Sequence, residues 1–291
     1  SATNYNPLQN IIKEINELNE NNEKKTLIVI PSTSDLNQHN ISFFGRINGG
    51  NIVGRQLGKY KRELIPMMSY SSLILLAEGD QGSVRPVSIV FDKAVRNSNY
   101  FENIKYFQRE NGDTYSLWQR TKSAPAPPDF VDTFQDMASN LSLGPKGVKD
   151  VFDEIGVHHM IDGHLQYQDR VKEKAQKTLI NKPNNIKARW SLTLLAILQN
   201  RPEEADKHLA VLEKLEIGNP WPSAYRSIVN LIDLNPWKSF TISNRDDKKY
   251  TNKTLIALND ISGFLTGRLW LYSKANSSLN LAIEEIEHQL K

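Results

Sequence analysis

Glycines and cations recur together in one stretch of the chain, from Gly45 to Arg62. The stretch contains five glycines and five cations, and no Asp or Glu occurs between Asp35 and Glu63. Glycine lets a backbone approach a ligand closely, and clustered cations without counter-charges attract an anion. The pattern therefore predicts a flexible, phosphate-binding segment with five contact residues: Arg46, Arg55, Lys59, Lys61 and Arg62.

The same stretch lacks the glycine patterns that bind a single nucleotide. Neither Gly-x-x-x-x-Gly-Lys-Ser/Thr nor Gly-x-Gly-x-x-Gly occurs in it. A row of phosphates, as in a nucleic-acid backbone, matches the pattern better than one nucleotide does. The alternative interpretation is a surface loop, in which the glycines only turn the chain and the cations are solvated.

A second basic region lies between Gln166 and Trp190, where seven cations face two acids. On the helix predicted there, Arg170, Lys174 and Lys177 are three to four residues apart and share a face. Two basic regions in separate lobes predict a groove for an extended single-stranded nucleic acid, with RNA as the expected partner. The nearby aromatic residues that could stack on bases are Phe43, Phe44, Tyr60 and Trp190.

Glycine and proline also occur together in the segment from Leu143 to Lys149, Leu-Gly-Pro-Lys-Gly-Val-Lys. The segment resembles half of a helix-hairpin-helix motif, and the resemblance implies a turn whose backbone N–H groups contact a phosphate. The alternative is an ordinary helix that begins at a proline and runs to Ile155, with Gly156 as its end.

Three of the six histidines lie in the segment from Val157 to His164. Its sequence His158-x-x-x-Asp162-Gly163 resembles the His-x-x-x-Asp-Gly signature of acyltransferases of the chloramphenicol-acetyltransferase and condensation-domain type. The resemblance implies that His158 is a general base and that Asp162 braces it. The alternatives are a metal site that also uses His159 and His164, or histidines in a turn between helices.

The composition is that of a globular protein without cysteine. Of 291 residues, 39% are hydrophobic and 24% are charged, and the net charge is only +3, so affinity for a polyanion must come from local patches. The lack of cysteine excludes disulfides, thiolate catalysis and cysteine-based zinc sites. No secretory signal and no membrane-length apolar run is visible, so we expect a cytoplasmic protein that needs no membrane, cofactor or metal.

The elements expected in the first half of the chain are mixed. Apolar residues at helical spacing predict an amphipathic helix at Leu8–Leu18, within an arm of residues 1–25 that docks on the body or on a neighbouring copy. Residues 26–121 are expected to form a mixed α/β lobe. Its strands are predicted at Thr26–Ile30, Ile41–Phe44 and Val84–Phe91, its buried helix at Glu63–Ala77, and its hairpin strands at Ile104–Arg109 and Thr114–Gln119, joined by Asn111-Gly112.

The second half is expected to be helical, after a stiff proline-rich linker at residues 122–129. The turns Asn219-Pro220-Trp221 and Asn235-Pro236-Trp237 resemble one another, but their spacing of 16 residues is too short for a repeat unit, so an irregular helical lobe is expected over residues 130–291. Its predicted helices are Phe130–Asn140, Gly147–Ile155, Gln166–Asn181, Ile186–Gln199, Pro202–Leu215, Ala224–Leu234, Thr254–Ser273 and Leu279–Leu290.

These patterns together predict the α+β class, with a mixed amino-terminal lobe and a mostly helical carboxy-terminal lobe. The leading hypothesis is a non-enzymatic assembly protein that binds single-stranded RNA, in the manner of a viral nucleoprotein or coat protein. It would form homo-oligomers through a terminal helix, either Leu8–Leu18 or Leu279–Leu290. The alternatives are an α-helical scaffold that binds a protein partner and an acyltransferase-like enzyme that uses His158 and Asp162.

Overall fold

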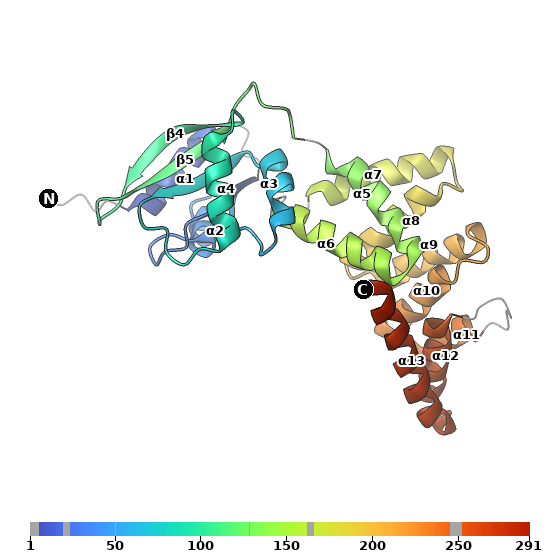
Figure 1. Ribbon diagram of the computed structural model, residues 1–291. Helices are drawn as coiled ribbons and strands as arrows, with labels where there is room; N and C mark the ends of the chain where they lie inside the picture. Colours follow the sequence, from blue (N-terminus) through green and yellow to red (C-terminus); the bar gives the residue numbers. More distant parts are fainter. Residues whose placement is uncertain (1–5, 20–23, 50, 128, 162–165, 245–251) are drawn as a thin grey trace. The chain divides into compact units, whose positions relative to one another are not determined.

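The computed structural model describes residues 6–19, 24–49, 51–127, 129–161, 166–244 and 252–291 (Figure 1). The chain divides into two compact units. Unit 1 comprises residues 1–128 and 155–165, and unit 2 comprises residues 129–154 and 166–291. The predicted α+β class is confirmed, because unit 1 contains a mixed five-stranded sheet whereas the described part of unit 2 is helical.

The sheet of unit 1 has the strand order β2-β1-β3-β5-β4. Strands β1, β2 and β3 are parallel, β5 runs antiparallel to β3, and β4 runs antiparallel to β5. The predicted hairpin is confirmed as β4 and β5, and Gly112 in its turn has a φ of 88°. The strand bounds are Lys25–Val29 (β1), Ile52–Arg55 (β2), Leu73–Glu78 (β3), Phe101–Gln108 (β4) and Thr114–Arg120 (β5).

Helices cover both faces of this sheet (Figure 1). The predicted amphipathic helix is confirmed as α1 (Pro7–Leu18), which packs with α2 (Gln38–Ile47) on one face. On the other face lie α3 (Leu64–Tyr70) and α4 (Pro86–Asn97). The strands alternate accordingly, because Leu27 belongs to the first apolar cluster and Ile28 to the second.

The strand predicted at Ile41–Phe44 is wrong, because these residues lie in helix α2. Asn37 caps the helix: its side chain accepts hydrogen bonds from the backbone N–H groups of His39 and Asn40, and the Asn40 side chain accepts one from the N–H of Asn37. This reciprocal cap fixes the first turn. A run of only four apolar residues does not distinguish a strand from one side of a helix.

Two further predicted elements are corrected by the positions of prolines. The helix expected at Glu63–Ala77 is a short helix, α3, followed by the buried strand β3, and Pro66 falls in the first turn of α3, where proline is tolerated. The strand expected at Val84–Phe91 lies mostly in helix α4, which Pro86 begins. A proline at the first position of a helix removes only an N–H that would have no partner within the helix.

The described helices of the second half largely match the predicted ones, and α7 and α9 have the predicted bounds, but the end expected at Gly156 is wrong because α6 continues to Ile161. The expected helix Thr254–Ser273 is wrong, because Gly267 with a φ of 96° separates two helices there. The bounds are Phe130–Ala138 (α5), Pro145–Ile161 (α6), Gln166–Asn181 (α7), Ile186–Leu198 (α8), Pro202–Leu215 (α9), Trp221–Ile232 (α10), Pro236–Ser243 (α11), Lys253–Leu265 (α12) and Tyr272–Leu290 (α13), with 3₁₀ turns at Lys61–Glu63 (η1), Ser139–Leu143 (η2) and Leu269–Leu271 (η3).

Helices α8 to α13 form three consecutive helix pairs. Each of these helices packs most extensively against its neighbours in the chain. The first helices of the pairs begin at Ile186, Trp221 and Lys253, and the second helices begin at Pro202, Pro236 and Tyr272. These starting points recur every 32 to 36 residues, which is the period of helix-pair repeat arrays.

The described part of the second half is helical as expected, but the expectation that its helices are arranged irregularly is wrong. Of the two similar turns, Asn219-Pro220-Trp221 precedes the first helix of a pair and Asn235-Pro236-Trp237 precedes a second helix, so their spacing does not measure the repeat. The repeat is visible in the backbone conformation instead. Asn200, Leu234 and Gly267 have positive φ, and each lies in the turn of one of the three successive pairs. No helix among the described residues is long and apolar enough to cross a membrane.

Candidate functional site

The glycines of the first basic stretch hold helix α2 against strand β2. A Cβ atom on Gly45 would lie 2.7 Å from the carbonyl oxygen of Ile52, and one on Gly54 would lie 2.6 Å from that of Gln38. Gly49, with a φ of 67°, follows the end of α2. Among the described residues up to Arg55, the stretch thus contains the end of α2, a turn and β2 instead of the expected flexible segment, and Gly45, Gly49 and Gly54 have packing and turn roles.

The backbone positions of the five cations lie near opposite ends of the parallel strands. Helix α2 connects two parallel strands and so runs antiparallel to them, which places Arg46, in its last turn, at the edge where the strands begin. Arg55 ends β2 and the other three cations follow it, at the edge where the parallel strands end. The Arg46 side chain turns back along α2, where its Nε donates a hydrogen bond to the carbonyl oxygen of Ser42 at 3.2 Å.

Three consecutive cations remain together after β2. Lys59, Lys61 and Arg62 are exposed around η1, and the guanidinium carbon of Arg62 lies 4.7 Å from the centre of the exposed Tyr60 ring. Among the described residues, no ion pair involves Lys59 or Lys61. Burial lowers the pKa of Arg55, which is half-buried. This group, Lys59, Lys61 and Arg62, is called the η1 cations below.

Three of the seven cations of the second basic region contact acids of helix α5 and its N-cap in the same unit. Arg170 lies 3.7 Å from Asp129, Lys174 forms an ion pair with Asp132, and a third pair joins Lys187 to Asp136 at 2.7 Å. Lys177 is exposed on the same helix as Arg170 and Lys174. These pairs are at the surface, where each contributes at most about 1 kcal/mol to stability, but they reduce the positive field of the region.

Two of the aromatic residues predicted to stack on bases are covered by the protein itself. Trp190 is fully buried and donates a hydrogen bond from Nε1 to Glu216 at 2.8 Å, and Phe44 packs against the core cluster of α1 and α2. Phe43 and Tyr60 are exposed. Of the four, these two are therefore the ones available to a ligand.

The segment from Leu143 to Gly147 is shaped by packing. A Cβ atom on Gly147 would overlap the carbonyl oxygen of Asn140, and one on Gly144, which has a φ of 82°, would overlap the ring of Trp221. Pro145 begins α6. The glycines that suggested a phosphate-binding turn are therefore required by close contacts within unit 2.

The histidine segment lies at the edge of what the structure describes. His158 and His159 are in the backbone of α6, and their side chains are outside the described set. Asp162, Gly163 and His164 lie outside the described residues. The acyltransferase and metal hypotheses for this segment therefore stay predictions. Within the described part of the chain, no three His, Asp or Glu side chains are grouped to hold a metal ion.

A polar cluster that the sequence patterns missed lies where β1 and β3 end. The hydroxyl of Tyr115 donates to Asp35 Oδ2 at 2.8 Å and lies 2.9 Å from Thr33 Oγ1. The guanidinium of Arg109 lies over the Tyr115 ring, 4.7 Å from its centre, and 3.8 Å from Asp35. In a sheet of this kind the carboxyl ends of parallel strands, where the chain order reverses, are the usual ligand position.

Burial and the neighbouring Asp35 carboxylate raise the pKa of Tyr115 to about 12. Burial alone would raise the pKa of Asp35, but hydrogen bonds from Thr33 and Tyr115 and the charge of Arg109 hold it below its usual range. The cluster borders a cavity of about 630 Å³. At neutral pH the cluster combines an ionised carboxylate with a neutral phenol. These groups already hydrogen-bond one another, so they connect β5 to the segment that follows β1.

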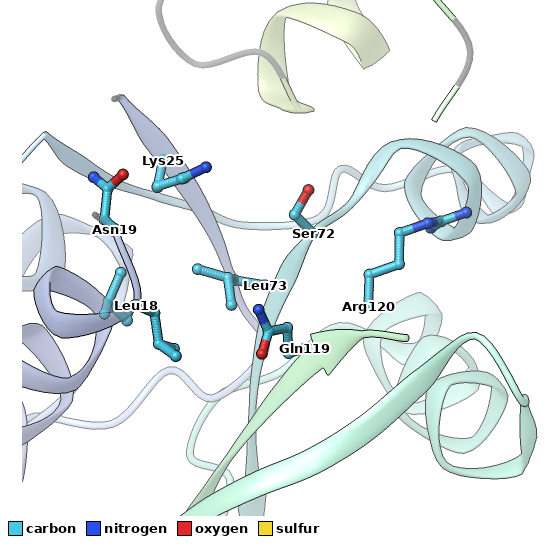
Figure 2. A pocket seen from close by; sticks show the side chains of 8 residues that line it. Leu18, Asn19, Lys25, Ser72, Leu73, Gln119 and Arg120 are labelled. Atoms are coloured by element: carbon cyan, nitrogen blue, oxygen red, sulfur yellow. The ribbon is translucent and has the colours of Figure 1, made fainter. Parts of the chain in front are cut away.

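A smaller cavity of about 230 Å³ lies at the opposite edge of the sheet (Figure 2). Lys25, Ser72 and Arg120 are among its lining residues. Figure 2 shows the guanidinium of Arg120 directed away from Leu73. It donates hydrogen bonds to the carbonyl oxygens of Met68 at 2.8 Å, Ser71 at 3.2 Å and Pro125 at 2.7 Å. Arg120 thus fastens the first part of the proline-rich segment to unit 1 instead of facing a ligand.

Several highly exposed large apolar side chains lie at the turns within helix pairs of unit 2. Consecutive helices joined by short turns run antiparallel, so these turns share one edge of the array. Leu234 is 88% exposed, Trp237 63% and Trp270 77%. The surface that they form is called the turn-edge surface, and its members are Ile232, Leu234, Trp237, Leu265, Leu269 and Trp270.

The fold and these sites define a two-unit α+β protein that joins a mixed sheet to an array of helix pairs. Comparisons of the chain with protein-family models, with curated proteins and with solved structures found no match.

Proposed function

We propose that this protein is a non-enzymatic interaction scaffold, in which the helix pairs of unit 2 bind another protein along the turn-edge surface. The carrying observation is that exposed tryptophan recurs at corresponding places: Trp237 is the second residue of α11, and Trp270 lies in η3, directly before α13. Tryptophan is enriched among the residues that dominate binding energy. Successive helix pairs therefore present a repeated apolar contact to a partner chain.

The test compares the proteins retained by three forms of the full chain: the natural sequence, the double variant Trp237→Ala/Trp270→Ala, and Ile217→Ala. Ile217 is a matched control, because it is 84% exposed in the turn between α9 and α10, at the other edge of the array. We expect the double variant to lose at least about tenfold in affinity for the partner, or about 1.4 kcal/mol, and the control to keep it. Equal retention by all three forms would contradict the proposal.

The η1 cations favour a second candidate function, the binding of single-stranded RNA by unit 1. Their charges lie close together, they are exposed, and Tyr60 offers a ring on which a base can stack. Arg46 and the cations opposite α5 are placed less favourably for the same ligand. The test is the binding of an unstructured RNA across a salt series, since phosphate contacts make affinity fall with salt.

The proposed scaffold also associates with copies of itself, and the terminal helix that serves this purpose is α13. Most of the apolar face of α1 is not available, because Leu8, Ile11, Ile12 and Ile15 are buried against the sheet of unit 1, and the exposed Leu18 stands at the end of the helix. Helix α13 differs: Leu279, Ile283 and Leu290 are each about 40% exposed. Self-association is thus assigned to the later of the two terminal helices predicted for it.

A further inference from the structure

Helix α13 carries two separate stripes along its length. Ala275, Ser278 and Ala282 are buried, in the helix whose main contacts are with α12 (Figure 1). A second stripe is mostly exposed, with steps of alternately four and three residues, and its members are Tyr272, Asn276, Leu279, Ile283, Ile286 and Leu290. At 100° per residue this stripe stays within about 40° of one line, about a quarter turn from the buried one.

The spacing of the exposed stripe is that of the seam between two coiled helices, where apolar residues recur in steps of three and four. We propose that the stripe binds α13 of a second copy of this chain, parallel and in register, about a two-fold axis that runs along the seam. This deepens the self-association proposed above and rests on it. A two-fold axis is the commonest symmetry of protein oligomers, and it makes one stripe complementary to itself.

Asn276 supports the parallel arrangement, because it is the one amide in an otherwise apolar or aromatic stripe. In a parallel pair in register, Asn276 faces Asn276 of the second copy, and each amide can donate to the other. In an antiparallel pair centred on the stripe, Asn276 would face Ile286, and its polar atoms would lose water without gaining a partner. A single asparagine in such a seam is a known means of fixing register and the number of strands.

The charges of α13 are compatible with this direction. In a parallel pair the residues that flank the seam meet across it five positions apart, so Ala275 faces Asn280 and Ala282 faces Glu287. No two acids are opposite one another. Glu284 and Glu285 lie more than about 100° from the centre of the stripe, on sides of the helix that point away from the second copy. The seam is short, so we expect a dissociation constant on the order of micromolar.

Sedimentation of the full chain over a concentration series tests the dimer. Ile283→Glu places a charge in the seam, and Leu281→Glu is the matched control, because Leu281 is similarly exposed, 49% against 44%, but lies on the opposite side of the helix. We expect Ile283→Glu to raise the dissociation constant at least about tenfold, and Leu281→Glu to change it less than about twofold. A natural chain that stays monomeric at about 100 times the expected constant, or equal effects of both variants, would overturn the proposal.

Disulfide trapping tests the direction, because the chain has no cysteine of its own. Tyr272→Cys and Leu290→Cys keep Asn276 and the inner layers intact, and they are oxidised separately and as a mixture of differently tagged chains. In the parallel pair, identical positions face one another, whereas positions 272 and 290 lie 18 residues or about 27 Å apart, beyond the roughly 7 Å that a disulfide allows between Cα atoms. We expect each variant to link to itself and no link between the two tags. Linking only between the two tags would show an antiparallel pair and refute the proposed geometry.

The role of Asn276 has its own readout. Asn276→Leu removes the amide pair from the seam, so we expect tighter association together with a loss of direction. In the trapping experiment, this substitution should allow links between positions 272 and 290 that the natural asparagine prevents. An Asn276→Leu chain that still links only identical positions would show that the amide does not set the direction.

The two proposals fail separately. If Ile283→Glu abolishes the dimer while partner retention still depends on Trp237 and Trp270, both hold. If the natural chain is monomeric and Ile283→Glu instead removes a bound partner, the stripe binds a helix of another protein and the self-association is refuted. The scaffold proposal is judged only by the turn-edge variants.

Discussion

Leu234 has the backbone conformation that Asn200 has 34 residues earlier, with φ angles of 55° and 54°. Each residue lies in the turn of a helix pair, two positions before the proline that begins the second helix. Asparagine tolerates this left-handed region, whereas leucine is strained in it. Leu234 is also 88% exposed, so burial does not compensate for the strain. A contact with a partner supplies a reason for leucine at this position.

Leu234→Gly is therefore expected to stabilise the isolated protein by about 1 kcal/mol, because glycine adopts positive φ without the steric cost of a side chain. Urea unfolding measures this. Asn200→Gly is the control and should change stability by only a few tenths of a kcal/mol, because asparagine already tolerates this conformation. In the retention assay, Leu234→Gly should lower the affinity of the chain for its partner protein. A destabilised Leu234→Gly variant would show that its side chain packs within the protein.

Gly45→Ala is expected to destabilise unit 1 by about 1–3 kcal/mol, because its methyl group would meet the backbone of Ile52. Gly156→Ala is the control, since nothing lies within 4 Å of the methyl group added there and the site is helical. That change should stabilise by up to about 1 kcal/mol. Thermal unfolding of both variants checks the pair. An unchanged Gly45→Ala variant would show that α2 and β2 are not held in direct contact by this residue.

From the raised pKa of Tyr115 we predict that the protein loses stability in alkali. Its pKa is about 12 in the folded protein against an ordinary value of 10. A raised folded-state pKa stabilises the fold fully below pH 10, and this contribution disappears as the pH rises from 10 to about 12. Unfolding free energies across that window should fall less steeply for Tyr115→Phe than for the natural chain. Parallel curves would mean that the hydroxyl is not held by Thr33 and Asp35.

Neutralising the η1 cations to glutamine is expected to reduce the salt dependence of RNA binding. Three phosphate contacts correspond to a slope change of about 2 in a plot of log affinity against log salt for a single strand. The control triple, Arg170→Gln/Lys174→Gln/Lys187→Gln, should change the slope by less than about 1, because these cations already face acids of α5. Equal changes in both triples would place the phosphates elsewhere.

Parts of the fold with a strong local signal were predictable from the sequence. Helix α1 has a long amphipathic repeat, and the hairpin of β4 and β5 has Asn111-Gly112 at its turn. The elements whose type was predicted wrongly, such as α2, contain short apolar runs that suit either a strand or one side of a helix. Their type was decided by Asn37 and by contact with β2, which are a capping and a tertiary effect.

The candidate surfaces were less predictable. The turn-edge surface depends on the exposure of Trp237 and Trp270, and the sequence does not distinguish these from the buried Trp190. The strained φ of Leu234 has no sequence signature, because only glycine or asparagine would have suggested it. Predicting the cluster of Thr33, Asp35 and Tyr115 would have required the strand order, because the strand order brings together residues that are about 80 positions apart in the sequence.

The chain passes between the two units three times, and this affects how the gene can be divided. Residues 155–165 belong to unit 1, and Val157 is one of the buried residues of the cluster beneath α3 and α4. A fragment that ends at Pro128 would omit Val157 and expose apolar side chains that it covers, which favours aggregation. The complementary fragment would carry Val157 without the apolar cluster in which it is buried. No single cut of the chain therefore separates unit 1 from unit 2 with all of the residues of each.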